Sequence, residues 1–65
     1  MYKVKVVDWE LNKIVATYDA DTLWAAQDLG HYLANYWLTN NEKIVIEQWP
    51  NKIIGWYQYK GEWEQ

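Results

Sequence analysis

His31, the only histidine of the chain, is the first residue to consider for catalytic chemistry. Asp28 precedes it by three residues, so in a helix the two side chains would share one side, and a His–Asp pair can orient a general base. The chain has no serine and no cysteine, and none of its threonines stands in a context that suggests activation as a nucleophile. We therefore expect His31 and Asp28 to be a solvated surface pair, and we expect the protein not to be an enzyme.

Two pairs of carboxylates, Asp19 with Asp21 and Glu62 with Glu64, are the candidates for metal chemistry. Hard cations require about six or more oxygen ligands in a formed loop, and no calcium-loop pattern is present. Helix capping explains the first pair, and a polar tail explains the second. The absence of cysteine excludes disulfides and thiolate sites. The sequence predicts no metal and no cofactor.

The charge pattern disfavours two classes of partner. Nine acidic residues outnumber six basic ones, and every basic residue is lysine. A nucleic-acid-binding domain is expected to carry a basic stripe, with arginine for bidentate contacts, and polybasic membrane attachment is disfavoured in the same way. No apolar run approaches the roughly 18 residues of a membrane span, and no signal-peptide pattern is present, so we expect a cytoplasmic protein. A short acidic chain of this kind fits a bacterial or phage origin.

The length of 65 residues predicts one domain, covering residues 1–65, with a core too small to be strongly stable. Dense aromatic packing and self-association are the remaining ways to stabilise it. Six tryptophans and six tyrosines suit both, because each buries a large area when enclosed.

The first two strands are predicted from alternation in residues 2–10 and from the apolar run at 13–18. A three-residue loop, 10–12, would place Asn12 in the left-handed region. This loop pairs Val4 with Tyr18, Val7 with Val15 and Trp9 with Lys13.

A helix is predicted from residue 22 to 38 or 39, with Asp21 as its N-cap and Asp19 as a competitor. Asn40 and Asn41 would end it, one of them in the left-handed conformation. Helical spacing places one apolar stripe against the sheet, made of Ala26, Leu29, Gly30, Leu33, Tyr36 and Trp37. A glycine within that stripe indicates a close approach of the helix backbone to the sheet.

The last two strands are predicted over residues 43–49 and 52–59, joined by a turn at Pro50 and Asn51. Pairing of Ile44 with Tyr57 and of Ile46 with Gly55 would face the helix together with Ile53. Pairing of Val45 with Trp56 and of Glu47 with Ile54 would face the other way. The expected fold class is α+β, a ββαββ unit with a four-stranded, mainly antiparallel sheet in the order 2-1-3-4 and one helix on one face.

The helix can cover only one side of this sheet. The other side is predicted to carry a contiguous apolar surface, which monomers rarely leave exposed. Its residues are Val7, Trp9, Val15, Val45, Trp49, Ile54 and Trp56. A homodimer with the sheets packed back to back is the expected explanation; a docking site for another protein and a C-terminal tail folded over the face through Trp63 are the alternatives.

A second possible contact site lies on the helix side opposite the apolar stripe, at Trp24, Asp28, His31 and Asn35. Trp24 there is either a binding residue or packed under the preceding loop. The sequence thus predicts a small acidic protein-interaction domain, an inhibitor or an adaptor. The alternative is a module that binds single-stranded nucleic acid by stacking bases on the sheet aromatics.

Overall fold

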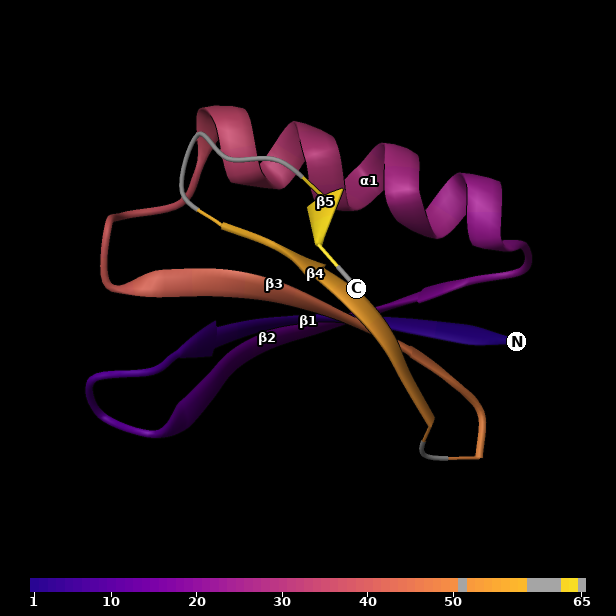
Figure 1. Ribbon diagram of the computed structural model, residues 1–65, viewed down its shortest axis with the longest axis horizontal. Helices are drawn as coiled ribbons and strands as arrows, with labels where there is room; N and C mark the ends of the chain where they lie inside the picture. Colours follow the sequence, from indigo (N-terminus) through magenta and orange to yellow (C-terminus); the bar gives the residue numbers. More distant parts are fainter. Residues whose placement is uncertain (51, 59–62, 65) are drawn as a thin grey trace.

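Two central strands, β1 (Tyr2–Asp8) and β3 (Glu42–Gln48), organise a sheet in which all neighbouring strands are antiparallel (Figure 1). The computed structural model describes residues 1–50, 52–58 and 63–64, so Asn51 and Glu62 lie outside the described residues. The other strands are β2 (Lys13–Ala20), β4 (Lys52–Tyr57) and β5 (Trp63–Glu64), and the sheet order is β2-β1-β3-β4-β5. The α+β class and the expected order of the first four strands are confirmed, and β5 adds a fifth strand.

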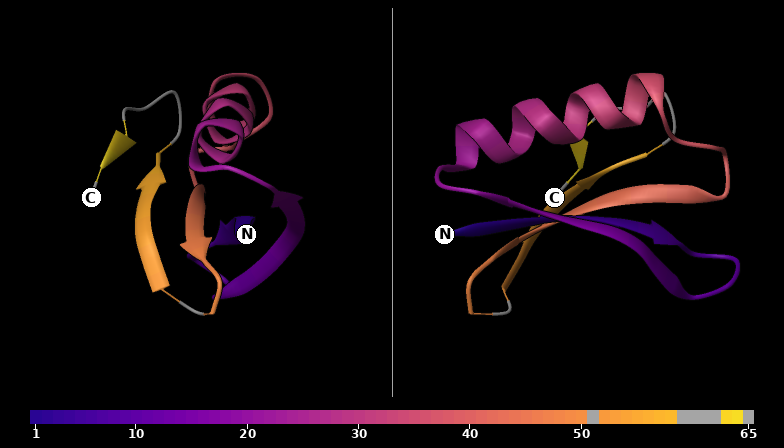
Figure 2. Two further views of the ribbon diagram at one scale, coloured as in Figure 1. Left: turned by 90° about the vertical axis from the view of Figure 1, so that its right-hand side faces the viewer. Right: turned by 180° about the vertical axis from the view of Figure 1, so that it is seen from behind.

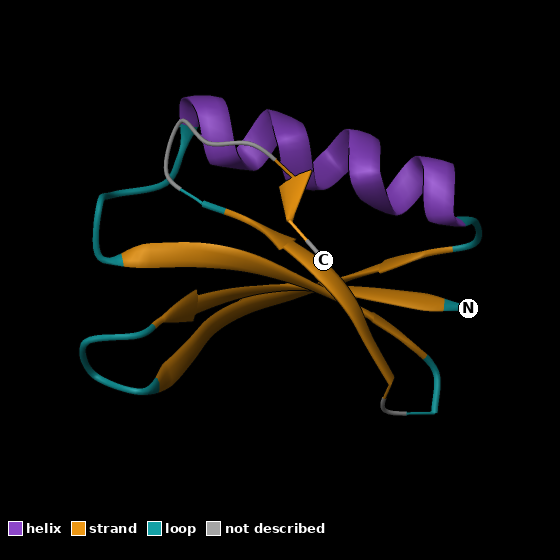
Figure 3. Ribbon diagram, viewed as in Figure 1, coloured by secondary structure: helices purple, strands orange, loops and turns teal. Residues whose placement is uncertain are grey.

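The helix α1 (Leu23–Tyr36) lies across one face of the twisted sheet and leaves the other face free (Figures 2 and 3). The core between the two layers consists of Val4, Val6, Ala26, Leu33, Ala34, Ile44, Ile46 and Tyr57. A Cβ atom added to Gly30 would lie 3.0 Å from Cδ2 of Tyr57 and 3.3 Å from Cγ2 of Ile44. The expected close approach at Gly30 is therefore confirmed.

The buried side of α1 differs from the predicted stripe at its end. The small residues Ala26, Gly30 and Ala34 recur every fourth position and are all buried. The larger side chains of Tyr36, the last helical residue, and of Trp37, the residue after it, are exposed. Their placement in the core was wrong.

The ends of α1 are also set by other residues than those expected. Thr22 is the N-cap, and its hydroxyl accepts a hydrogen bond from the N–H of Ala25 at 3.0 Å, in place of Asp21. The helix ends at Tyr36, earlier than predicted, and no described asparagine after it has positive φ. Instead, Thr39 and Glu42 close the connection, since the Thr39 N–H donates to Oε1 of Glu42 and the Glu42 N–H donates to the Thr39 carbonyl, both at 3.1 Å.

Both hairpin loops are one residue longer than predicted. In the first, Asp8 pairs with Lys13, so the loop spans residues 9–12, and Asn12 has the predicted positive φ, 53°. The Asp8 carboxylate stabilises this loop by accepting the N–H groups of Glu10 and Leu11, each at 3.0 Å. In the second, Gln48 pairs with Lys52, so Trp49 lies outside the pairing of β3 with β4. The predicted pairings near both loops were therefore wrong by one residue.

A β-bulge absorbs the extra residue in each hairpin. Val6 pairs with Ala16 but Val7 pairs with Ile14, which leaves Val15 as the additional residue. Likewise Ile46 pairs with Gly55 but Glu47 pairs with Ile53, which leaves Ile54 unpaired.

The bulges overturn the predicted faces of two residues. Val15 lines a groove of about 370 Å³ on the helix side together with Leu33, Trp37 and Leu38 of the helix end, and Ile54 packs against the core. Their neighbours Ile14 and Ile53 take their places on the other face, because directly opposed residues share a face. Val15 and Ile54 therefore do not belong to the uncovered surface.

Trp63 lies on the helix side of the sheet. It pairs with Tyr57, and the two ring centroids are 5.0 Å apart. A Cβ atom on Gly55 would overlap the Trp63 ring and would lie 2.6 Å from the carbonyl oxygen of Glu64. The alternative in which Trp63 covers the opposite face was wrong, and the ring instead extends the core beyond the helix.

Candidate interaction surfaces

We call the side of the sheet turned away from α1 the outer face. Trp9 and Trp49 stand at its opposite ends, because each extends the pairing of β1 with β3 by one residue. The Trp9 N–H donates to the Asn41 carbonyl at 3.1 Å, and the Trp49 N–H donates to the Met1 carbonyl at 2.9 Å. The side chains of Trp9, Trp49 and Ile53 are 56%, 62% and 61% exposed. The outer face thus presents large apolar side chains at both ends.

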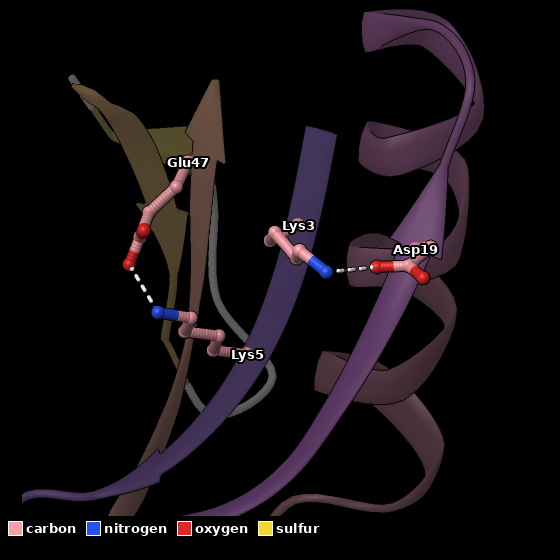
Figure 4. Close-up of polar contacts among 4 residues, drawn as sticks. All are labelled: Lys3, Lys5, Asp19 and Glu47. Carbon is pink, nitrogen blue, oxygen red and sulfur yellow. Dashed lines mark hydrogen bonds and ion pairs between the residues drawn. The ribbon is translucent and has the colours of Figure 1, made fainter. Parts of the chain in front are cut away.

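Paired charges occupy the middle of the outer face (Figure 4). Lys3 Nζ lies 2.7 Å from Oδ1 of Asp19, and Lys5 Nζ lies 2.8 Å from Oε2 of Glu47. The Lys5–Glu47 pair is the less exposed of the two. The surface is therefore not the contiguous apolar patch that the sequence predicted, since two ion pairs interrupt it.

Trp56 lies between Val45 on β3 and Glu64 on β5. Its indole Nε1–H donates to Oε2 of Glu64 at 2.7 Å, and Nε2 of Gln58 donates to the same oxygen at 2.7 Å. Lys43 Nζ lies over the Trp56 ring, 5.8 Å from its centroid. The hydrogen bond and the cation fix one edge and one face of this ring, so Trp56 is less free to bind a partner than Trp9.

A groove of about 450 Å³ opens at the Trp9 end of the outer face. Its lining consists of Trp9, Asn40, Glu42, Lys43, Trp56, Gln58 and Glu64. Two aromatic rings flank one lysine, as stacking of a base would require, but two carboxylates share the lining. The groove therefore lacks the positive potential with which a single-stranded nucleic acid is held.

The structure divides the four residues of the predicted helix site. Trp24 is 76% exposed, so it does not pack under the preceding loop. The His31 ring instead contacts Tyr57 edge-on, with centroids 5.8 Å apart and planes at 69°, and Nδ2 of Asn35 donates to the His31 carbonyl at 2.8 Å. Trp24 and Asp28 remain as residues available to a partner.

Two tyrosines that the sequence analysis did not assign to a site join Trp24 and Asp28. A shallow groove of about 400 Å³ on α1 is lined by Trp24, Ala25, Asp28, Leu29, His31, Tyr32 and Tyr36. The rings of Tyr32 and Tyr36 lie 5.1 Å apart, and Tyr36 is 74% exposed. The spacing of four residues from 24 to 28, 32 and 36 was the signal that could have identified this row.

Burial, together with the negative charge of Asp28, raises the pKa of Tyr57 above its usual value. Tyr57 lies beneath the helix, in contact with Gly30 and His31. It therefore stays protonated at neutral pH, as a core residue rather than a reacting group.

Within residues 1–50, 52–58 and 63–64, no three His, Asp or Glu side chains gather as metal ligands would. Over the same residues, no helix has the length and apolarity needed to cross a membrane.

No protein-family model, curated protein or solved structure matches this chain.

Proposed function

We propose that the protein is a non-enzymatic protein-interaction domain that self-associates through its outer face. The observation that carries the proposal is the exposure of Trp9, Trp49 and Ile53 on a face that also holds two ion pairs, Lys3–Asp19 and Lys5–Glu47. The proposed contact residues are Val7, Trp9, Ile14, Val45, Trp49, Ile53 and Trp56. A cytoplasmic inhibitor or adaptor of bacterial or phage origin is the role that this proposal fits.

The paired charges make contact between two copies possible despite the net charge of −3. Lys3 and Lys5 are paired with Asp19 and Glu47, so these four charges cancel within each copy before two faces meet. Two sheets can pack face to face about 10 Å apart, with the terminal tryptophans as anchors. Each helix then stays on the outside of the dimer.

The dimer is expected to be weak. The molecule measures 27 × 20 × 19 Å, so one face offers less than the roughly 800 Å² per partner of a standard interface. Covering the Lys5–Glu47 pair also has a desolvation cost that its own attraction does not fully offset. We expect a dissociation constant on the order of 10 µM.

Sedimentation equilibrium over a wide concentration range around about 10 µM tests this proposal. Trp49→Glu is the informative variant, because Trp49 is an exposed loop residue and its replacement leaves the core intact. Trp37→Glu is the matched control, since Trp37 is equally exposed but lies on the helix side. We expect Trp49→Glu to be monomeric and the control to dimerise. A wild-type protein that stays monomeric throughout would refute the proposal.

The second candidate is binding of single-stranded nucleic acid at the groove between Trp9 and Trp56. The observation in its favour is that Lys43 lines this groove together with both rings and lies over the ring of Trp56. Quenching of tryptophan fluorescence by an oligothymidylate at low salt, reversed by added salt, would support this function over self-association. We expect no quenching, because Glu42 and Glu64 repel phosphate from the same groove.

A further inference from the structure

We infer that the exposed side of α1 is a binding site for an arginine side chain of a partner protein. The site is the row formed by Trp24, Asp28, Tyr32 and Tyr36, which we call the helix row. The helix α1 that carries this row lies on the opposite side of the sheet from the outer face (Figures 1 and 2), so the site does not depend on self-association.

The geometry of the helix row places a carboxylate between aromatic rings. Side chains four residues apart are neighbours on a helix surface, with Cβ atoms about 5–6 Å apart. Asp28 therefore has Trp24 one turn before it and Tyr32 one turn after it, and Tyr36 continues the row with its ring 5.1 Å from that of Tyr32. All four side chains line the same groove of about 400 Å³. A cation that pairs with Asp28 thus lies within reach of two ring faces.

The guanidinium group of arginine can pair with the Asp28 carboxylate and stack on a neighbouring aromatic ring at the same time. It is planar, so it stacks on an aromatic ring, and its N–H groups donate in pairs to a carboxylate. The ammonium group of lysine would pair with Asp28 but would lose the stacking. Stacking on a neutral aromatic partner would leave the carboxylate unused.

Charge complementarity supports a cationic occupant. Asp28 is the only formally charged residue of α1, which contains no lysine, and the exposed Asp21 precedes the helix. The negative charge of Asp28 also contributes to the raised pKa of Tyr57, after the larger effect of burial. His31 is the one further titratable group besides the tyrosines in the groove, and its ring is directed to Tyr57. The groove therefore carries negative charge at neutral pH.

The occupant is a different protein rather than a second copy of this chain. The chain contains no arginine, and two of its six lysines, Lys3 and Lys5, are held in ion pairs on the outer face. A partner that presents an arginine on its surface supplies what this sequence lacks.

Binding can be measured by NMR with a short alanine-based peptide that carries one arginine, and with versions that carry lysine or citrulline in its place. Citrulline keeps the shape of arginine and removes the charge. We expect saturable shifts of the Trp24 indole and of the Asp28 amide with the arginine peptide. Binding should weaken about threefold to fivefold with lysine, through the loss of stacking, and should vanish with citrulline.

Variants separate this site from general attraction to an acidic protein. Asp28→Asn and Trp24→Ala should each weaken binding about threefold to fivefold, and Asp21→Asn should leave it nearly unchanged. The titrations use the Trp49→Glu background, so they do not depend on dimer formation. Equal binding of the citrulline peptide, no effect of Asp28→Asn, or shifts confined to the outer face would each overturn the inference.

Discussion

Of the two glycines that the structure describes, Gly55 is the one at which an added methyl group should be more damaging. A Cβ there meets the Trp63 ring and the backbone of β5, and backbone cannot move as a flexible side chain can. We expect Gly55→Ala to lower the free energy of unfolding by about 2 kcal/mol, as overpacking in a core does. Urea denaturation measures this change.

Gly30→Ala is the matched control for that prediction. Its Cβ would lie 3.0 Å from the Tyr57 ring, a tight contact with a side chain, and alanine gains up to about 1 kcal/mol of helix propensity. The two effects oppose each other, so the net change should be small. A Gly30→Ala variant as unstable as Gly55→Ala would contradict this account.

Tyr57 should make the protein sensitive to alkaline pH. Burial, and secondarily Asp28, raise its pKa above the usual value of about 10, so the unfolded chain releases this proton at lower pH than the folded one. The stability that depends on this proton is complete below about pH 10 and is lost as the pH rises through the raised pKa. Unfolding free energies measured from about pH 8 upward should therefore fall less steeply in Tyr57→Phe than in the wild type. If the unfolding free energy falls equally steeply with pH in both proteins, groups other than Tyr57 cause the loss of stability.

At the scale of the elements, the sequence predicted the strands and the helix well because each has one strongly buried side. Val4 and Val6, like Ile44 and Ile46, alternate with polar or less buried residues. The predicted pairings of Val4 with Tyr18, of Ile44 with Tyr57 and of Ile46 with Gly55 were confirmed. The sequence did not reveal the lengths of the two hairpin loops. Each bulge falls in an aliphatic doublet, Ile14–Val15 or Ile53–Ile54, so either residue satisfies an apolar position and the pattern cannot show which one turns inward.

The predicted helix stripe was wrong only at its C-terminal end, for a related reason. Hydrophobic periodicity gives weight to large residues such as Tyr36, whereas the buried side of α1 consists of Leu33 and the small residues Ala26, Gly30 and Ala34. The outward turn of Tyr36 created the helix row, which the sequence analysis divided between the core and a site at Trp24 and Asp28.

The second doublet provides a test at the element scale. Ile53 is exposed on the outer face, and Ile54 packs against the core. We expect Ile53→Lys to change the free energy of unfolding by less than about 0.5 kcal/mol in the monomeric Trp49→Glu background, and Ile54→Lys to cost about 2 kcal/mol or more. Urea denaturation of both variants measures the difference. A larger loss of stability in Ile53→Lys than in Ile54→Lys would instead support the pairing of Glu47 with Ile54 that the sequence predicted.

At the scale of the whole molecule, self-association and stability are linked. A dimer that forms only from folded chains stabilises them by mass action, so the melting temperature should rise by several degrees over a hundredfold increase in protein concentration. Trp49→Glu should melt at the same temperature throughout, because it cannot dimerise. Calorimetry at a series of concentrations distinguishes the two behaviours. A concentration-independent wild type would argue against the outer-face dimer.

The bulge at Val15 has a further consequence, because it lies in β2, an edge strand of the sheet. An open edge offers unpaired backbone groups to any passing extended chain, and a bulge interrupts the regular spacing that such a chain would need. Growth of the sheet from chain to chain at the β2 edge, the first step toward fibrils, is thus hindered. A short sequence with twelve aromatic residues has particular need of that protection.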